Sequence, residues 1–212
     1  RKENHMALRL SIEENAGIAR PMIPQGSQIA RCVGIMDLGT VMSDWQGKSR
    51  PRKRVALMFE FAKHKATFRE EDGPQPLVKT VTYTRTFNEK GALRKDLEAW
   101  RGAAFTQKEL LGWDLDAVLG QPCMVTITHK VTADGNTKDR ITGIGSMHED
   151  LKCPEQIIPG FVYDIKEHPK NWDKLPPWAR DEIKASDEYK AMNGTDETVN
   201  TVAEEEVDAV PF

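Results

Sequence analysis

The sequence predicts a mainly β domain that is interrupted by one helical segment. Apolar and polar side chains alternate along residues 53–62 and 77–87, which is the pattern of half-buried strands. Two further strand-like runs, residues 122–132 and 139–147, flank a hairpin turn of the sequence Asp-Gly-Asn. Residues 88–120 lie between these regions and carry the apolar spacing and capping residues of helices.

The first strand is predicted over residues 29–41, where Gly34 and Gly39 favour a bend or a bulge. A polar loop over residues 43–52 is expected to follow. The second strand, residues 53–62, has a large apolar side chain at every second position: Val55, Leu57, Phe59 and Phe61. We expect this face to lie in the core.

A charged loop, residues 64–76, leads to the third strand, residues 77–87, which has threonine at alternate positions along one face. Asn88 is then expected to cap a helix that runs to Trp100. One stripe of this helix is apolar: Leu93, Leu97 and Trp100. The sequence from Thr106 to Glu109 forms a capping box, and residues 114–119 predict a further short helix.

The predicted order is three strands, a helical segment and two strands. A five-stranded Greek-key barrel of the OB type has its helix in the same place, between strands 3 and 4. Other small α+β domains share this order, so it favours the OB fold without excluding them. The predicted organisation is an N-terminal arm (1–27), an OB-fold domain (28–148), a C-terminal extension (149–186) that packs on the barrel or on a second subunit, and a disordered acidic tail (187–212).

Composition favours a cytoplasmic protein with a modest core. Apolar residues make up 39% of the chain and charged residues 30%, and no apolar run approaches the roughly 20 residues of a membrane span. No signal-peptide pattern is found, and three scattered cysteines favour reduced thiols. Residues 1–5, which precede Met6, are expected to be an expression remnant.

The C-terminus is the most acidic part of the chain. From Asp187 onward it holds eight Asp or Glu and one Lys, a net charge of −7, which leaves +4 on residues 1–186 because the whole chain carries −3. A basic body with an acidic peptide is typical of a nucleic-acid binder that also recruits proteins. The end of the chain offers an aromatic anchor for a partner's pocket: Asp208, Pro211 and Phe212. A tail that only aids solubility is the alternative.

The densest basic cluster follows the first predicted strand, beside Trp45. It has five cations within seven residues: Lys48, Arg50, Arg52, Lys53 and Arg54. Such cations neutralise phosphates, and an exposed indole stacks with a base. In an OB barrel this loop borders the nucleic-acid surface on strands 2 and 3. The alternative is a solvated loop with Trp45 packed on the core.

Two other regions offer candidate contacts. On the third strand, one face carries Lys79, Tyr83 and Arg85. Tyr83 either stacks with a base or lies in the core, with its basic neighbours reaching solvent. Beside the second hairpin, three further cations either close the groove or are ordinary surface charges: Lys130, Lys138 and Arg140.

No phosphate-loop, dinucleotide or serine-hydrolase motif is present. The four residues that come nearest to a zinc site, Cys123, His129, His148 and Cys153, fit no zinc-finger spacing. We therefore expect no enzymatic activity, no metal and no cofactor. A metal-dependent nuclease, which would need clustered acids, is kept as an alternative.

Five segments carry a family resemblance: residues 22–24, 30–35, 83–84, 93–102 and 119–123. They resemble single-stranded DNA-binding proteins of tailed bacteriophages, and the likeness spans roughly residues 22–147 plus the tail. The resemblance implies an OB-fold core and an acidic C-terminal tail. The Pro-Phe ending is also similar to that of bacterial single-stranded DNA-binding proteins, whose last residues dock onto replication and repair proteins. Only the tail matches those proteins, so their base-stacking tryptophans are not carried over.

We therefore expect a phage protein that coats single-stranded DNA without sequence preference during replication and recombination, in the cytoplasm of the host bacterium. The tail is expected to recruit replication or recombination proteins and to compete with DNA for the basic surface. Without the tail, the body is expected to hold duplex DNA as well. Oligomerisation on DNA stays open, as does a role in protein interaction or virion assembly.

Overall fold

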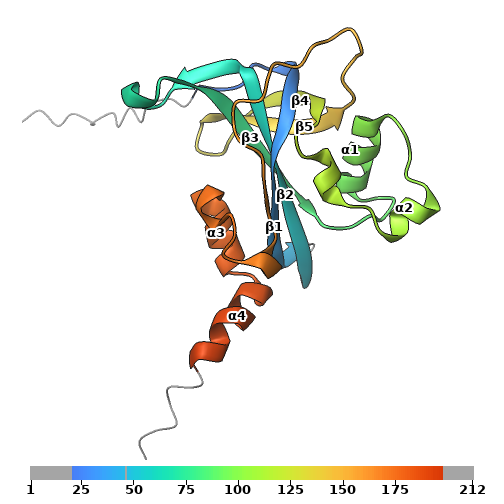
Figure 1. Ribbon diagram of the computed structural model, residues 1–212. Helices are drawn as coiled ribbons and strands as arrows, with labels where there is room; N and C mark the ends of the chain where they lie inside the picture. The colour runs from blue at the N-terminus through green and yellow to red at the C-terminus, as the bar shows by residue number, and fades with distance from the viewer. Residues whose placement is uncertain (1–20, 46, 198–212) are drawn as a thin grey trace, which may run out of the picture.

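The computed structural model of the protein describes residues 21–45 and 47–197, with the backbone alone for Trp45, Lys48 and residues 195–197. Five antiparallel strands lie in the order β3-β2-β1-β4-β5 (Figure 1). They are β1 (Gly26–Trp45), β2 (Lys48–Thr67), β3 (Pro74–Thr84), β4 (Pro122–Val131) and β5 (Thr137–Gly145). A sixth strand, β6 (Phe161–Tyr163), pairs in parallel with residues 34–36 of β1. The prediction of a mainly β fold is confirmed.

The helices form two groups (Figure 1). Helices α1 (Ala92–Arg101) and α2 (Gln107–Leu111) and a 3-10 turn at Leu115–Val118 lie between β3 and β4, where the sequence predicts helices. Helices α3 (Pro177–Lys184) and α4 (Asp187–Glu197) follow β6. No helix within residues 21–197 is long and apolar enough to cross a bilayer.

The hairpin of β1 and β2 is longer than the sequence indicates. The polar loop predicted over residues 43–52 is wrong, because the ladder continues from the Thr40–Lys53 pair to the Trp45–Lys48 pair. The last β2–β3 pair is Arg54–Thr84, so residues beyond it form a two-stranded arm. Both faces of such an arm meet solvent, which accounts for its polar sequence. We call residues 41–44 of β1 and 49–53 of β2 the basic hairpin.

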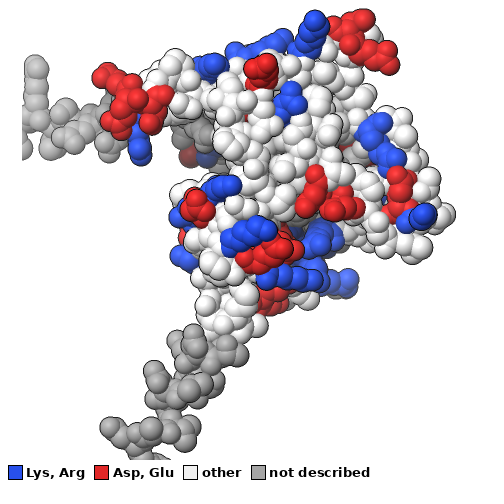
Figure 2. All heavy atoms as spheres, viewed as in Figure 1, with Lys and Arg blue, Asp and Glu red and all other residues white. Residues whose placement is uncertain are grey.

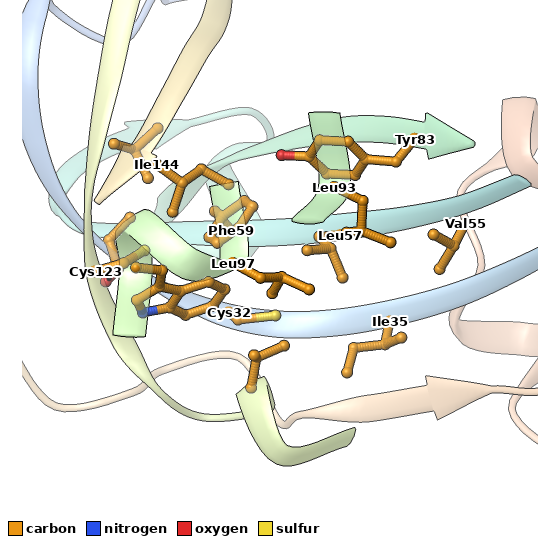
Figure 3. Close-up of a cluster of buried hydrophobic side chains, with 14 of the residues drawn as sticks. Cys32, Ile35, Val55, Leu57, Phe59, Tyr83, Leu93, Leu97, Cys123 and Ile144 are labelled. Atoms are coloured by element: carbon orange, nitrogen blue, oxygen red, sulfur yellow. Dashed lines mark hydrogen bonds between the residues drawn. The ribbon is translucent and has the colours of Figure 1, made fainter. Parts of the chain in front are cut away.

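One face of the sheet packs against the α1 segment. The predicted helical stripe is buried there and faces the predicted apolar side chains of β2 (Figure 3). Helix α1 begins after Gly91 rather than after Asn88, because the Asn88 carbonyl accepts a hydrogen bond from the Gly91 amide (2.7 Å) in a separate turn. The predicted capping box is confirmed: Thr106 Oγ1 accepts from the Glu109 amide, and the Glu109 carboxylate accepts from the Thr106 amide (2.7 Å).

A second hydrophobic core lies on the opposite face of β1 and β2, between the sheet and the C-terminal extension. Its buried members are Met36, Leu38, Ala56, Phe161, Tyr163, Ile165, Leu175, Ala179 and Ile183. The buried carboxylate of Glu60 in β2 holds the approach to β6, since it accepts hydrogen bonds from the amides of Ile157 (3.0 and 3.1 Å) and Ile158 (2.5 Å).

Helices α3 and α4 meet the sheet at Gly39, which has a φ of +73°. A Cβ atom at this position would lie 2.6 Å from Ser186 Cβ and 2.9 Å from Glu188 Oε2, so a side chain cannot fit without displacing the helices. Glu188 belongs to the segment that the sequence assigns to the disordered tail. Residues 187–197 of that segment instead form α4, which contacts β1.

Candidate nucleic-acid interface

The three candidate residues on and just after β3 are all engaged by carboxylates of the same chain. Lys79 forms an ion pair with Asp139 of β5, and Asp139 also accepts a hydrogen bond from the Ile23 amide (3.1 Å). Burial would raise the pKa of Asp139, but the hydrogen bonds from Lys79 and the Ile23 amide outweigh it and hold that pKa below its ordinary value. Lys79 therefore joins the two edge strands of the sheet, β3 and β5, and its charge is offset by Asp139.

Tyr83 lies in the core. Its side chain is 5% exposed and its hydroxyl donates a hydrogen bond to Asp96 Oδ2 of α1 (2.7 Å), as the surroundings in Figure 3 illustrate. Burial, followed by the hydrogen bond to Asp96, raises the pKa of Tyr83 above its usual range. Of the two alternatives that the sequence leaves open, the structure shows the interior one, so this ring cannot stack with a base.

Arg85, just beyond β3, is half-exposed and donates to Asp37 Oδ2 at 2.9 Å. Burial raises the pKa of Asp37, and the Gly39 amide and Arg85 only partly oppose that effect. The guanidinium charge is therefore largely offset by its own carboxylate partner. Among the candidate residues, Arg85 is the one that lines a cleft, which is described below.

The basic hairpin is different, because none of its cations forms an ion pair within the described residues, although the charge of Lys53 helps to lower the pKa of Glu188. Side chains of a strand alternate between faces. Arg50, Arg52 and Arg54 therefore share one face of β2, the face toward α3, and Lys53 is on the opposite face. Arg54 forms an ion pair with Glu182 of α3. Within the described chain, Arg50, Arg52 and Lys53 have no carboxylate at ion-pair distance.

Figure 2 shows Lys and Arg side chains gathered around the lower end of the β1–β2 hairpin, beside acidic groups. The backbone of β1 pairs Trp45 with Lys48 at the tip of this arm. The side chains of these two residues lie outside the described part of the structure, so stacking by Trp45 stays a prediction. Asp208, Pro211 and Phe212 also lie outside it.

The third candidate group lies on the β4–β5 hairpin. Lys130 and Lys138 face each other across the ladder, and Arg140, opposite Thr128, lies on the same face. All three cations are exposed, and in residues 21–197 none has a carboxylate partner. Like charges opposite one another destabilise a ladder, so an anion held between the two lysines would relieve a local repulsion.

The two unpaired groups of cations do not flank one groove. β4 pairs with residues 26–31, near the start of β1, whereas the basic hairpin is formed by the other end of that strand. The sequence, interpreted as an OB barrel, predicts that both groups of cations border one cleft. The structure instead places them at opposite ends of β1. A bound strand would have to extend along β1 to reach both.

One exposed aromatic side chain near the basic hairpin is missed by the sequence reasoning. Trp178 of α3 is 40% exposed and lies one helical turn before Glu182, the ion-pair partner of Arg54. The sequence shows an amphipathic stretch here, and the helix does pack on the sheet through Ala179 and Ile183. In the sequence, Trp178 lies outside the spacing of Ala179 and Ile183, and this could have indicated that its ring is exposed.

The four Cys and His residues that come nearest to a zinc site in the sequence have other contacts in the structure. His129 binds the Ile23 carbonyl oxygen (2.8 Å), while Cys123 and Cys153 both approach the carbonyl oxygen of Ala30 (3.7 and 3.9 Å). Across the described residues, no three His, Cys, Asp or Glu side chains gather in a metal-binding arrangement.

Comparison with known proteins assigns no family to the chain. No family model matches the sequence, and no curated protein matches it.

Proposed function

We propose that the protein binds single-stranded DNA with little sequence preference, and that the basic hairpin supplies the main contacts. The observation that carries this proposal is the contrast between two sets of cations. Lys79 and Arg85 are paired with carboxylates, whereas Arg50, Arg52 and Lys53 form no ion pair in the part of the chain that the structure describes. Unpaired cations on an exposed arm release counterions when they meet phosphates, which favours binding.

The strand order supports an OB-type barrel for this proposal. The order β3-β2-β1-β4-β5, with helices between β3 and β4, is that of an OB barrel opened between its third and fifth strands. The Lys79–Asp139 ion pair joins those two strands across the opening. In OB folds, single strands bind across the outer surface of the second and third strands. Here the C-terminal extension covers that surface at β2, so the proposed contacts lie beside it, on the basic hairpin and at the exposed Trp178.

Bases of any sequence offer a flat π face, so an indole that stacks with them accepts them without discrimination. We assign this role to Trp178 and, at the tip of the arm, to Trp45. We further propose, from the resemblance in the sequence, a phage protein that acts in replication or recombination in the host cytoplasm. Its C-terminal residues, ending in Phe212, would dock onto partner proteins of those processes.

The test is a titration with labelled oligo(dT), read by fluorescence anisotropy at several salt concentrations. Two triple variants remove the same charge: R50A/R52A/K53A from the basic hairpin, and K108A/K166A/K174A from exposed lysines elsewhere. Each phosphate contact contributes roughly −0.7 to the slope of log affinity against log salt. The hairpin variant should therefore bind more weakly and lose about 2 from the slope. The control should match wild type.

If both variants bind oligo(dT) equally well, the hairpin is not the interface. If wild type does not bind at all, the proposal fails. Tighter binding of duplex than of oligo(dT) would favour a duplex-binding ribbon, because two antiparallel strands fit the major groove. Degradation of the labelled strand with Mg²⁺ would favour the nuclease alternative.

A further inference from the structure

A second surface of the protein is a cleft of about 620 Å³. It lies between the segment that follows α2 and the segment that follows β6. The apolar wall of the cleft continues the core that packs against α1. Ile35 and Val55 belong to that core, at the end farthest from Cys123, and they also line the cleft (Figure 3). The main apolar lining is formed by Val55, Phe87, Leu110, Trp113, Leu115 and Val162. Such a lining is typical of a site that receives an apolar side chain.

The rim of the cleft is acidic. It holds five carboxylates, Asp37, Asp114, Asp116, Asp164 and Glu167, and two cations, Arg85 and Lys170. Both cations are already paired, Arg85 with Asp37 (2.9 Å) and Lys170 with Glu167 (2.7 Å). Within the described chain, Asp114, Asp116 and Asp164 have no cation at ion-pair distance. The cleft therefore presents a net negative charge.

The three unpaired carboxylates come from two separate segments that converge at the rim. Asp114 Oδ1 accepts the Asp116 amide (3.0 Å), and Asp164 Oδ1 accepts the Lys166 amide (2.9 Å), so both carboxylates are held in place by their own turns. Burial raises the pKa of Asp116, and the neighbouring charges of Asp114, Asp164 and Glu167 raise it further. An incoming cation would relieve this like-charge repulsion.

An apolar side chain is also exposed at the mouth. Leu111 lines the cleft and is 91% exposed, next to the half-buried ring of Trp113. Trp113 is held edge-on by Phe105 (5.1 Å between ring centroids) and Phe87 (6.1 Å). These contacts set the orientation of the Trp113 ring, and the exposed leucine extends the apolar wall outward.

Several occupants conflict with this chemistry. Phosphates of DNA would be repelled by the unpaired carboxylates, and so would the protein's own acidic C-terminal residues. A metal ion would need three or more gathered ligands, which the described residues do not provide. A group that carries both positive charge and apolar surface satisfies the rim and the wall together.

We propose that this cleft docks a short segment of a partner protein in which apolar residues alternate with lysine or arginine. The apolar side chain enters between Val55 and Trp113, and the cations meet Asp114, Asp116 and Asp164. This site differs from the basic hairpin in charge and adjoins it at Arg85, whose amide donates a hydrogen bond to the Lys53 carbonyl oxygen (2.8 Å).

The test uses a fluorescein-labelled ten-residue peptide in which leucine alternates with lysine and arginine. Two matched peptides replace either the leucines by serine or the cations by glutamate. The full-length protein should bind the first peptide and bind both matched peptides at least tenfold more weakly. The D114N/D116N/D164N variant should lose at least tenfold in affinity, because three charges are removed while asparagine still caps both turns.

The control variant E70Q/E71Q/D72N removes the same charge from exposed residues of another turn and should bind the peptide like wild type. L111S should weaken peptide binding without affecting folding, since that side chain is almost fully exposed. Equal peptide binding by the rim and control variants would overturn the proposal. Self-association of wild type that the rim variant abolishes, without peptide binding, would assign the cleft to a second copy and overturn it as well.

Oligo(dT) affinity separates this proposal from the proposed function. The rim variant should bind oligo(dT) at least as well as wild type. If wild type binds the peptide but not oligo(dT), the DNA proposal fails while the docking proposal stands.

Discussion

The carboxylate of Glu188 in α4 accepts two hydrogen bonds from Thr40 of β1, one from the amide and one from the hydroxyl, each at 2.6 Å. Burial would raise the pKa of Glu188, but these bonds outweigh it and keep the pKa below its ordinary value. Thr40 directly precedes the basic hairpin. The helix that leads into the acidic C-terminal residues is therefore attached at the base of the most basic arm of the protein.

This attachment leads to a prediction about residues 198–212, which carry a net charge of −4. Their deletion should strengthen oligo(dT) binding at low salt, because an acidic segment tethered beside the hairpin competes with phosphates. The gain should shrink as salt rises, since screening weakens both interactions. Anisotropy titrations of both forms at two salt concentrations measure the effect. Equal affinities at low salt would exclude competition by the tail.

Trp178 should contribute to DNA binding through its exposed ring. Replacement by alanine should cost about 1–3 kcal/mol of oligo(dT) binding, which is roughly the value of one base stacked on an aromatic ring. W178F should retain most of the affinity because phenylalanine still offers a flat face. The quenching of tryptophan fluorescence by oligo(dT) should also fall in both variants. Unchanged quenching in W178A would show that the indole does not meet a base.

Tyr83 should matter for stability and not for DNA. Y83F removes the hydroxyl that donates to Asp96 and leaves a partly buried carboxylate short of a partner, at a cost of about 1–3 kcal/mol. Urea unfolding followed by circular dichroism measures this loss. Oligo(dT) affinity measured on the same variant, well below its unfolding midpoint, should equal that of wild type. A loss of affinity without a loss of stability would contradict the interior assignment.

The Lys79–Asp139 pair should make stability depend on pH. The lowered pKa of Asp139 means that its contribution is present above the ordinary value of 3.8 and is lost as the pH falls through the lower folded-state value. D139N should therefore be less stable than wild type at pH 7, and the difference should shrink at pH 3. Urea unfolding of both proteins at the two pH values tests this. A difference that stays constant with pH would argue against a charged pair.

Glu60 should be among the most sensitive polar positions. E60A removes the acceptor of three hydrogen bonds from the amides of Ile157 and Ile158 and leaves a cavity beneath that segment. We expect a loss of about 3 kcal/mol in the free energy of unfolding, and a smaller loss for E60Q, which keeps one acceptor oxygen. Hydrogen exchange should show faster opening of the segment before β6 in both variants. Protection equal to wild type would mean that other contacts hold it.

The sequence predicts those parts of the fold that depend on local spacing. The stripe of Leu93, Leu97 and Trp100, the capping box at Thr106 and the alternation around Phe59 are all found where periodicity places them. Residues 43–52 mislead because polar and proline-containing sequence is typical of loops, yet a two-stranded arm with both faces in solvent has the same composition.

The candidate site is harder to predict than the fold, because its outcome depends on partners far away in the chain. Lys79 and Arg85 look like free cations in the sequence, and their carboxylates lie 60 and 48 residues away. Helix α4 is joined to β1 by a contact between Glu188 and Thr40, which are 148 residues apart. No local pattern encodes such pairs, so burial and charge neutralisation appear only in the folded chain.

Gly39 gives the molecule a mechanical link that carries no charge. Since a single methyl group there would strike Ser186 and Glu188, the arm and the terminal helices are seated together through bare backbone. The close approach leaves no space between β1 and the turn that joins α3 to α4. A side chain at position 39 should therefore displace the terminal helices from β1 at any ionic strength.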